Sequence, residues 1–451
     1  MNSILIKNGL VIHADRQEKE DILIRGKTIV AVGNDLVSNH DALTIDATDK
    51  LVFPGVIDPH THMGIPIKSG SSADTFASGS RSALHGGVTT ILDFTVLEKG
   101  QTLVESFATR KQLAADSLCD VGLHINITRF EPEILAEIPH LISLGFNSFK
   151  VFTTYKEVGM MLNYSQIESV AQVIGDHGGV LMVHSEDDGV ISKASETYND
   201  RLKTNPKYHA LSRPGEAELV AIEQLGEISE RTRCTIYIVH LNTAAGLAKA
   251  GEYPLLKVET CPHYLLLSKE AYTREDGRMF VASPPLRSEA DQKALWLGLQ
   301  DGSIHTVGSD HCPFCLADKK EDIPFQDIPN GLGGVETLFP TLLAQFIERG
   351  IDLSLLVRLT SSNAAQIFGL DLFKGTISLG ADADLLIVDP TAVSKEWDSE
   401  LDTILDWNAY SGLPVIFPET VIKSGSIVVS KGALQHPAPG KLLRALSTPQ
   451  K

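Results

Sequence analysis

Hydrophobic positions follow one pattern near the two ends of the chain and another pattern in its middle. In residues 2–53, short apolar runs are separated by Asn-Gly, Arg-Gly and Gly-Asn turn signals, without helical periodicity, and similar short apolar runs return near the C-terminal end. This pattern is typical of antiparallel strands. Because both ends share it, we expect residues 1–53 and 375–430 to pair into one small β-sandwich domain. The runs lie at residues 4–6, 21–24, 29–32 and 43–45, and at 375–377, 383–388 and 421–429.

The middle of the chain alternates apolar runs with helical segments, which is the pattern of a parallel α/β structure. Eight such runs are present, so residues 54–374 are predicted to form a (β/α)8 barrel of the TIM type. In that fold, catalytic side chains project from the C-terminal ends of the strands. The runs lie at residues 51–57, 88–94, 120–127, 148–152, 180–183, 234–239, 255–259 and 304–308.

The last segment, residues 431–451, contains three prolines and a local basic cluster. Its pattern leaves two alternatives open, a loose tail or an arm that crosses to another subunit. The basic residues of this segment are Lys431, Lys441, Arg444 and Lys451.

Composition narrows the class of protein. The formal net charge of −18 argues against nucleic acid or an anionic membrane surface as a partner, because either would favour a basic face. No apolar run approaches the roughly 20 residues of a membrane span, and residues 1–11 lack the pattern of a signal peptide. Five scattered cysteines form no disulfide framework, so we expect a cytoplasmic protein. Cys312 and Cys315 have the spacing of a redox or zinc pair, but without a second pair we interpret them as bystanders.

Histidines and one aspartate close several of the predicted strands. His60 and His62 follow the first run, and residues two apart on a strand face the same way. Alone, such a pair is more often a surface or hydrogen-bonded pair than a metal site. The interpretation changes because His184, His240 and Asp310 close the fifth, sixth and eighth runs. Histidine with carboxylate suits Zn²⁺, and Fe, Mn or Ni are less favoured occupants.

Lys150 stands in the middle of the fourth predicted strand, where a bare ammonium is costly to bury without a partner. A structural ion pair is the simplest interpretation. Next to two dications, however, an ammonium is electrostatically unfavourable. A carbamate formed from this lysine and CO₂ is anionic and offers one oxygen to each metal. With Asp310 and a hydroxide it would leave a net positive charge that stabilises an oxyanion.

Longer motifs follow one another in a fixed order over nearly the whole chain. Together they resemble the cyclic amidohydrolases of the amidohydrolase superfamily, specifically the dihydropyrimidinase/D-hydantoinase branch. The motifs are PGVIDPHTH (54–62), FKVF (149–152), YHA (208–210) with RP (213–214) and EAE (216–218), ETCP (259–262), SPPLR (283–287), GSDHCPF (308–314), IPNG (328–331) and ADADL (381–385).

The resemblance implies roles for the candidate metal ligands. His60 and His62 would hold the more buried of two Zn²⁺ ions together with Asp310, and other divalent metals are possible. His184 and His240 would hold the second ion. Carboxylated Lys150 would bridge the two. The same resemblance implies a homotetramer or a homodimer.

Three further residues receive substrate-binding roles from the resemblance. Tyr155 would place its hydroxyl over the scissile carbonyl, and backbone groups around Ser283 and Asn330 would hold the amide and imide edge of a ring. Their structural alternatives are a packed aromatic residue and two turn formers. The YHA to EAE block, residues 208–218, is interpreted mainly as architecture.

The implied reaction is hydrolysis of a cyclic amide. A hydroxide bridging the metals would attack the carbonyl, and Asp310 would carry its proton to the departing nitrogen, giving an N-carbamoyl amino acid. Dihydroorotases typically place an arginine two residues after the second histidine of His-x-His to bind a ring carboxylate, whereas this chain has Gly64. A neutral cyclic ureide is therefore expected: dihydrouracil, dihydrothymine or a 5-substituted hydantoin.

Two alternatives stay open at this point. One is allantoinase, although Tyr155 and the IPNG motif favour the first interpretation. The other is a non-catalytic scaffolding relative, which is disfavoured because all six ligand positions are filled. Residues 63–66 and 153–162, and residues 185–187, which depart from the usual family pattern, are expected to flank the mouth of the site and to influence the accepted substituent and enantiomer.

Overall fold

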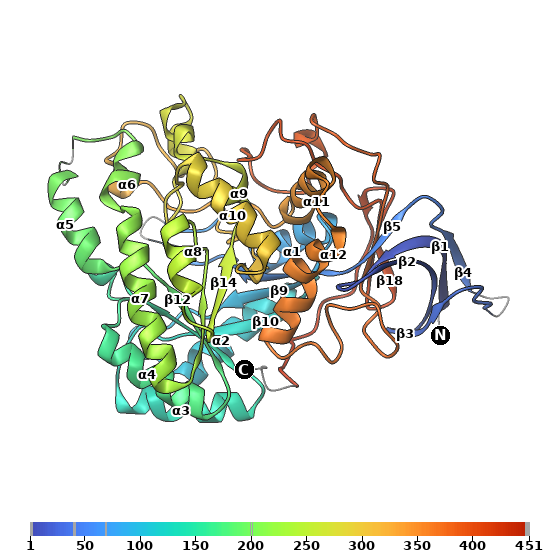
Figure 1. Cartoon of the computed structure of the whole chain (residues 1–451), viewed down its shortest axis with the longest axis horizontal. Helices are drawn as coiled ribbons and strands as arrows, with labels where there is room; N and C mark the ends of the chain where they lie inside the picture. Colours follow the sequence, from blue (N-terminus) through green and yellow to red (C-terminus); the bar gives the residue numbers. More distant parts are fainter. Residues whose placement is uncertain (1–2, 39–41, 68–69, 199, 201, 447–451) are drawn as a thin grey trace.

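The computed structural model describes residues 3–38, 42–67, 70–198, 200 and 202–446. It consists of a barrel of parallel strands surrounded by helices and a separate sheet built from both ends of the chain (Figure 1). The predicted fold class is confirmed. None of the helices within the described ranges is both long enough and apolar enough to cross a membrane.

The barrel contains eight parallel strands in the described part of the chain, and they follow one another in chain order. The barrel closes where Thr61 pairs with His311 and the His62 amide donates to the His311 carbonyl at 2.8 Å. The strands are β6 (Val56–Thr61), β9 (Val88–Phe94), β10 (Asp120–Asn126), β11 (Ser148–Phe152), β12 (Val180–His184), β13 (Thr235–Ile238), β14 (Leu256–Thr260) and β15 (Thr306–Val307).

The first predicted run was wrong in one respect, because residues 51–57 form two strands and not one. β5 (Leu51–Pro54) belongs to the terminal sheet, and only β6 belongs to the barrel. The chain passes between them at Gly55, where a Cβ atom would lie 2.3 Å from Thr89 Oγ1. A residue without a side chain is therefore required at this crossing.

Helices cover the outside of the barrel, as the periodicity of the middle segment predicts. Several begin at side-chain caps that satisfy the free amides of the first turn, including Thr75, Thr102, Asn163 and Ser288. The helices are α1 (Phe76–His85), α2 (Leu103–Leu113), α3 (Pro132–Ser143), α4 (Tyr164–Asp176), α5 (Asp188–Tyr198), α6 (Lys207–Ser212), α7 (Gly215–Thr232), α8 (Ala244–Ala250), α9 (Pro262–Leu266), α10 (Glu289–Asp301), α11 (Leu338–Arg349), α12 (Leu353–Val357) and α13 (Asn363–Ile367).

Strands from both ends of the chain form one mixed sheet beside the barrel (Figure 1). The sheet bends back on itself, because the Ile29 amide donates to the Ala381 carbonyl at 2.9 Å and both halves share one apolar core around Ile6, Ile24 and Leu385. Its strands are β1 (Ser3–Ile12), β2 (Gln17–Arg25), β3 (Thr28–Gly33), β4 (Leu43–Asp46), β5, β16 (Leu385–Val388), β17 (Thr420–Lys423), β18 (Ser426–Ser430) and β19 (Ala433–Leu434).

A buried ion-pair cluster joins this sheet to the barrel. Lys374 Nζ lies 2.6 Å from Asp120, 3.0 Å from Asp382 and 2.5 Å from Asp384, and Lys423 Nζ lies 3.0 Å from Asp120. These carboxylates are close enough to bind a metal ion, but the lysines already neutralise them. We therefore interpret the cluster as structural.

The segment after residue 431 is not a loose tail over its described part. The Val121 amide donates to the Lys441 carbonyl, and the Val121 carbonyl accepts from the Leu443 amide. Lys441 also pairs with Asp382 at 2.7 Å. The segment thus packs against the barrel of its own chain, and residues 447–451 lie outside the described residues.

Candidate active site

A cavity of about 640 Å³ lies at the C-terminal end of the barrel strands. Its lining includes all nine site residues that the sequence predicts, which come from six different strands or the loops that follow them. The predicted side chains in the lining are His60, His62, Lys150, Tyr155, His184, His240, Ser283, Asp310 and Asn330.

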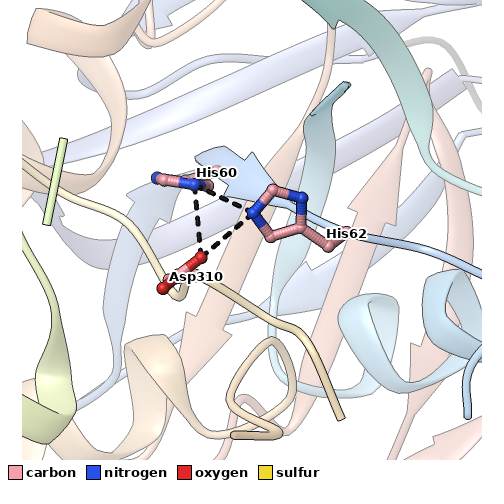
Figure 2. Close-up of side chains that lie close together, drawn as sticks. All are labelled: His60, His62 and Asp310. Carbon is pink, nitrogen blue, oxygen red and sulfur yellow. Dashed lines mark hydrogen bonds and ion pairs between the residues drawn. The ribbon is translucent and has the colours of Figure 1, made fainter. Parts of the chain in front are cut away.

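His60, His62 and Asp310 form the tightest group in the cavity (Figure 2). Both Nε2 atoms lie 3.2 Å from Asp310 Oδ1, and they lie 3.1 Å from each other. Burial alone would raise the pKa of Asp310, but the charge interactions with His60 and His62 outweigh it and hold the pKa well below its usual range. Three donor atoms that converge in this way fit a single divalent ion.

His184 and His240 form a second pair beside the first group. Their ring centroids lie 4.5 Å apart, and the His240 ring lies 5.5 Å from that of His60. His240 Nδ1 is buried without a hydrogen-bond partner among the described residues. His184 Nε2 donates to Glu186 at 2.8 Å, which leaves its Nδ1 lone pair available. Burial lowers the pKa of His184 to about 4, so its neutral form is favoured.

Lys150 is buried in the cavity wall, and its ammonium forms no hydrogen bond or ion pair with any residue that the structure describes. Its Nζ lies 4.8 Å from the centroid of the Phe94 ring and 5.3 Å from that of Phe152. A structural ion pair therefore does not explain this lysine. Burial lowers the pKa of Lys150 to about 8, which increases the fraction of neutral amine that can react with CO₂.

Three of the predicted residues have a left-handed backbone at the strand ends. The φ angles are 69° for Tyr155, 44° for His240 and 48° for Asp310. This conformation costs a non-glycine residue of order 1–3 kcal/mol and occurs often at active sites. The fold thus holds these three residues in a backbone conformation that an unconstrained chain would not favour.

The other edge of the cavity carries the predicted substrate-binding residues. Asn330 Nδ2 donates to Ser283 Oγ at 3.0 Å, so two segments far apart in sequence meet there. Burial raises the pKa of Tyr155 to about 12, so its hydroxyl is a proton donor at neutral pH.

Three charged residues that support the site were not predicted. Glu259 accepts from His60 Nδ1 at 2.8 Å, and Glu186 accepts from His184 and from Arg213 Nη2 at 2.5 Å. Such carboxylates fix the orientation of a metal-binding imidazole. A buried acid two residues after His184 was a possible signal, but its partner lies 27 residues away. The prediction that residues 208–218 are mainly architecture was incomplete, because Arg213 is connected to the site.

The expectation that residues 185–187 flank the mouth was wrong. Ser185 and Glu186 are buried and do not line the cavity, and Asp187 accepts from the Tyr164 hydroxyl at 2.7 Å. By contrast, residues 63–66 and 153–162 do contribute to the lining, through Ile65, Pro66, Tyr155, Val158, Gly159 and Met160.

Cys312 lines the cavity, whereas Cys315 does not. Burial raises the pKa of the Cys312 thiol well above its usual range, so the thiolate that a nucleophile requires is disfavoured.

Comparison with known proteins identifies the family. The family model of the amidohydrolase family matches residues 51–428. The chain belongs to this family. It is 36% identical over 422 residues to a D-phenylhydantoinase of Escherichia coli O1:K1, covering 91% of this chain and 90% of that protein. The resemblance to the dihydropyrimidinase/D-hydantoinase branch and the predicted class, a cyclic-amide hydrolase, are thereby confirmed.

Solved structures of amidohydrolases have the same fold. The dihydropyrimidinase from Brevibacillus agri is 32% identical, with a TM-score of 0.96 and full coverage of both chains. An L-hydantoinase from Arthrobacter aurescens is 26% identical, with a TM-score of 0.90, and covers 98% of this chain and 100% of its own. Because hydantoinases of both D and L type are similar to this chain, the fold does not determine the enantiomer.

Proposed function

We propose that this amidohydrolase opens the ring of a neutral cyclic ureide, a dihydropyrimidine or a 5-substituted hydantoin, to an N-carbamoyl amino acid. The observation that carries the proposal is the convergence of five metal-ligand side chains and an unpaired buried lysine in one cavity. The names of the relatives, D-phenylhydantoinase and dihydropyrimidinase, support the substrate class.

The residues fit a pair of divalent ions. His60, His62 and Asp310 would hold one ion, His184 and His240 would hold the other, and a carbamate on Lys150 would join them. Two observations support such a centre: a ring nitrogen of His240 is buried without a hydrogen-bond partner among the described residues, and Lys150 has no ion pair there. When bound, the ions would activate water and polarise the carbonyl, and the nitrogen and carboxylate ligands favour zinc.

Protein side chains then perform the proton transfers. The oxygen of water adds to the ring carbonyl carbon, and Asp310 accepts the proton that this water loses. The Tyr155 hydroxyl donates to the carbonyl oxygen as negative charge develops there. The amide C–N bond breaks, and Asp310 returns the proton to the departing nitrogen. Backbone groups near Ser283 and Asn330 bind the amide and imide edge of the ring.

The names of the relatives favour this substrate class over allantoin. The proposal also includes zinc as the metal, a cytoplasmic location, and assembly into a homotetramer or homodimer. Sedimentation velocity would measure the oligomeric state.

The direct test supplies purified protein with zinc and bicarbonate and measures ring opening of dihydrouracil, hydantoin and allantoin. We expect turnover of dihydrouracil or hydantoin and little turnover of allantoin. Turnover of allantoin alone would contradict the substrate assignment, and the absence of turnover on all three with two metals bound would contradict the function.

A further inference from the structure

The outer part of the cavity carries two cationic side chains that the reaction does not use. Among the lining residues, the charged side chains are Lys99, Arg129, Lys150 and Asp310. Lys150 and Asp310 belong to the proposed metal centre, so Lys99 and Arg129 are left over. Neither forms an ion pair with any carboxylate that the structure describes. The rim therefore carries positive charge without a protein counter-charge, in a protein whose net charge is −18.

Arg129 is anchored by one hydrogen bond and has one donor group without a partner. Its Nη2 donates to the carbonyl of Gln101, which joins the loop after β10 to the loop after β9. Its Nε is buried and has no hydrogen-bond partner within the described ranges. A buried donor without a partner is costly, whereas an arginine binds a carboxylate with two parallel hydrogen bonds. A ligand carboxylate in the cavity that Arg129 lines would satisfy this donor after a rotation of the Arg129 side chain.

Arg129 lies where it can contact a substituent of the substrate, and not the reacting ring. Asn126, the last residue of β10, is paired in register with Lys150. Arg129 lies three residues further along, a span of at most about 10 Å. A cavity of about 640 Å³ is also larger than a bare five- or six-membered ring requires. The ring can therefore lie at the metal centre while a side chain on its C5 atom extends to Arg129.

We infer that the site prefers cyclic ureides whose exocyclic substituent ends in a carboxylate, and that Arg129 is the specificity-determining residue, with Lys99 in a minor role. This inference rests on the proposed function and specifies its substrate class. The ring remains uncharged, as the glycine at position 64 indicates, and the negative charge lies on the substituent. Lys99 is exposed at the rim, where solvent weakens its contribution.

Two hydantoins of nearly equal size and shape, one anionic and one neutral, test the inference: 5-(2-carboxyethyl)hydantoin and 5-(2-carbamoylethyl)hydantoin. We expect the wild-type kcat/KM for the carboxylate to exceed that for the carboxamide by about tenfold or more. The ratio should fall as salt concentration rises. A ratio near one, or a preference for the carboxamide, would overturn the inference. The carboxamide is a demanding competitor, because it could also donate to the unpartnered Oδ1 of Asn126.

Variants then assign the preference to a residue. Arg129→Met should reduce the ratio to near one, Arg129→Lys should retain part of it, and Lys99→Met should reduce it by less than about fivefold. Because each ratio is measured within one variant, losses of folding or metal affect both substrates and cancel. Arg231→Met, on the exposed face of α7 where Arg231 pairs with Glu168, is the control and should keep the wild-type ratio. An Arg129→Met ratio equal to that of wild type would overturn the assignment.

The two proposals fail in different ways. If the wild-type protein opens neither hydantoin, dihydrouracil nor either substituted ring, the proposed function is wrong. If it opens the uncharged rings and shows no preference for the carboxylate, the function stands and the specificity inference is wrong.

Discussion

The guanidinium of Arg213 lies over the aromatic ring of Tyr155, with its central carbon 5.1 Å from the ring centroid. The same guanidinium pairs with Glu186, which accepts a hydrogen bond from His184. One arginine thus connects the tyrosine proposed to act on the carbonyl with a histidine proposed to bind a metal. The charge of Arg213 holds the pKa of Glu186 well below its usual range, against the effect of burial, so the pair is ionised.

Arg213→Met should lower both stability and turnover. Removing one partner of a buried ion pair costs about 3–5 kcal/mol, because the other charge is left uncompensated. Loss of support for a metal-binding histidine costs about 10–100-fold in activity. Urea unfolding and kcat measure these effects, and Arg274→Met, at an exposed surface pair, is the control. The double variant Glu186→Gln/Arg213→Met should be more stable than Arg213→Met; strictly additive losses would contradict the pairing.

Lys319→Met should loosen the substrate edge of the cavity. The buried Lys319 ammonium donates to the carbonyls of Met279, Val281 and Gly331 at 2.7–2.9 Å, and so joins the segments next to Ser283 and Asn330. Three buried carbonyls without donors would cost about 3 kcal/mol or more in stability. We also expect KM to rise more than kcat falls. Lys320→Met changes the exposed neighbouring lysine and should have neither effect; an unchanged KM in Lys319→Met would contradict the positioning role.

His85 should make stability depend on pH. Its Nδ1 lies 2.6 Å from Glu336 Oε1, and its Nε2 lies 3.0 Å from the Gly432 carbonyl, so it joins α1 to the terminal sheet. Burial opposes protonation, but the hydrogen bond to Glu336 outweighs it and raises the pKa of His85 above 6.5. Its stabilising effect is therefore fully present below pH 6.5 and is lost as pH rises through the folded-state pKa.

The test compares urea unfolding of the wild-type protein and His85→Gln from about pH 6 to pH 9. The stability difference between them should shrink with rising pH. His140→Gln, at an exposed position on α3, should show a constant difference. A difference for His85→Gln that grows with pH would contradict the assigned direction.

Much of the candidate site follows from the sequence because the barrel converts position along the chain into position in space. Each parallel strand ends at the same rim, so His184, His240 and Asp310 had to converge once their apolar runs were recognised as strands. The split of residues 51–57 was not predictable in this way. Both strands are apolar and buried, and only the close approach of Gly55 to Thr89 reveals the passage between two sheets.

Supporting contacts could not be predicted because they depend on distant partners. Glu186 was expected only to flank the mouth of the site, whereas the structure places Arg213 against it. Arg129 resembled any loop cation, since only the lining of the cavity and the missing carboxylate partner distinguish it. The period of a strand predicts which side chains face a site, but it carries no information about what packs behind them.

Asp310→Asn should reduce turnover by about 10²-fold or more, because an amide cannot carry the proton from water to the departing nitrogen. Rates are normalised to bound metal, since Asp310 is also a proposed ligand. Asp318→Asn, at an exposed position nearby, should leave the rate unchanged. A normalised rate for Asp310→Asn close to that of wild type would remove its proton-transfer role.

Lys150→Ala should lose most of the bound metal, because the proposed carbamate is the protein group that would join the two ions. Elemental analysis of protein loaded with zinc and bicarbonate measures the metal content, with Lys156→Ala, an exposed lysine beyond the same strand, as the control. Loading in CO₂-depleted buffer should lower the metal content of the wild-type protein but not that of Lys150→Ala. Short carboxylates such as propionate should partly restore metal to the variant, since the cavity beside Phe94 and Phe152 would then accept an anion in place of the carbamate. A Lys150→Ala protein that retains two metal ions per chain would show that the lysine does not join them.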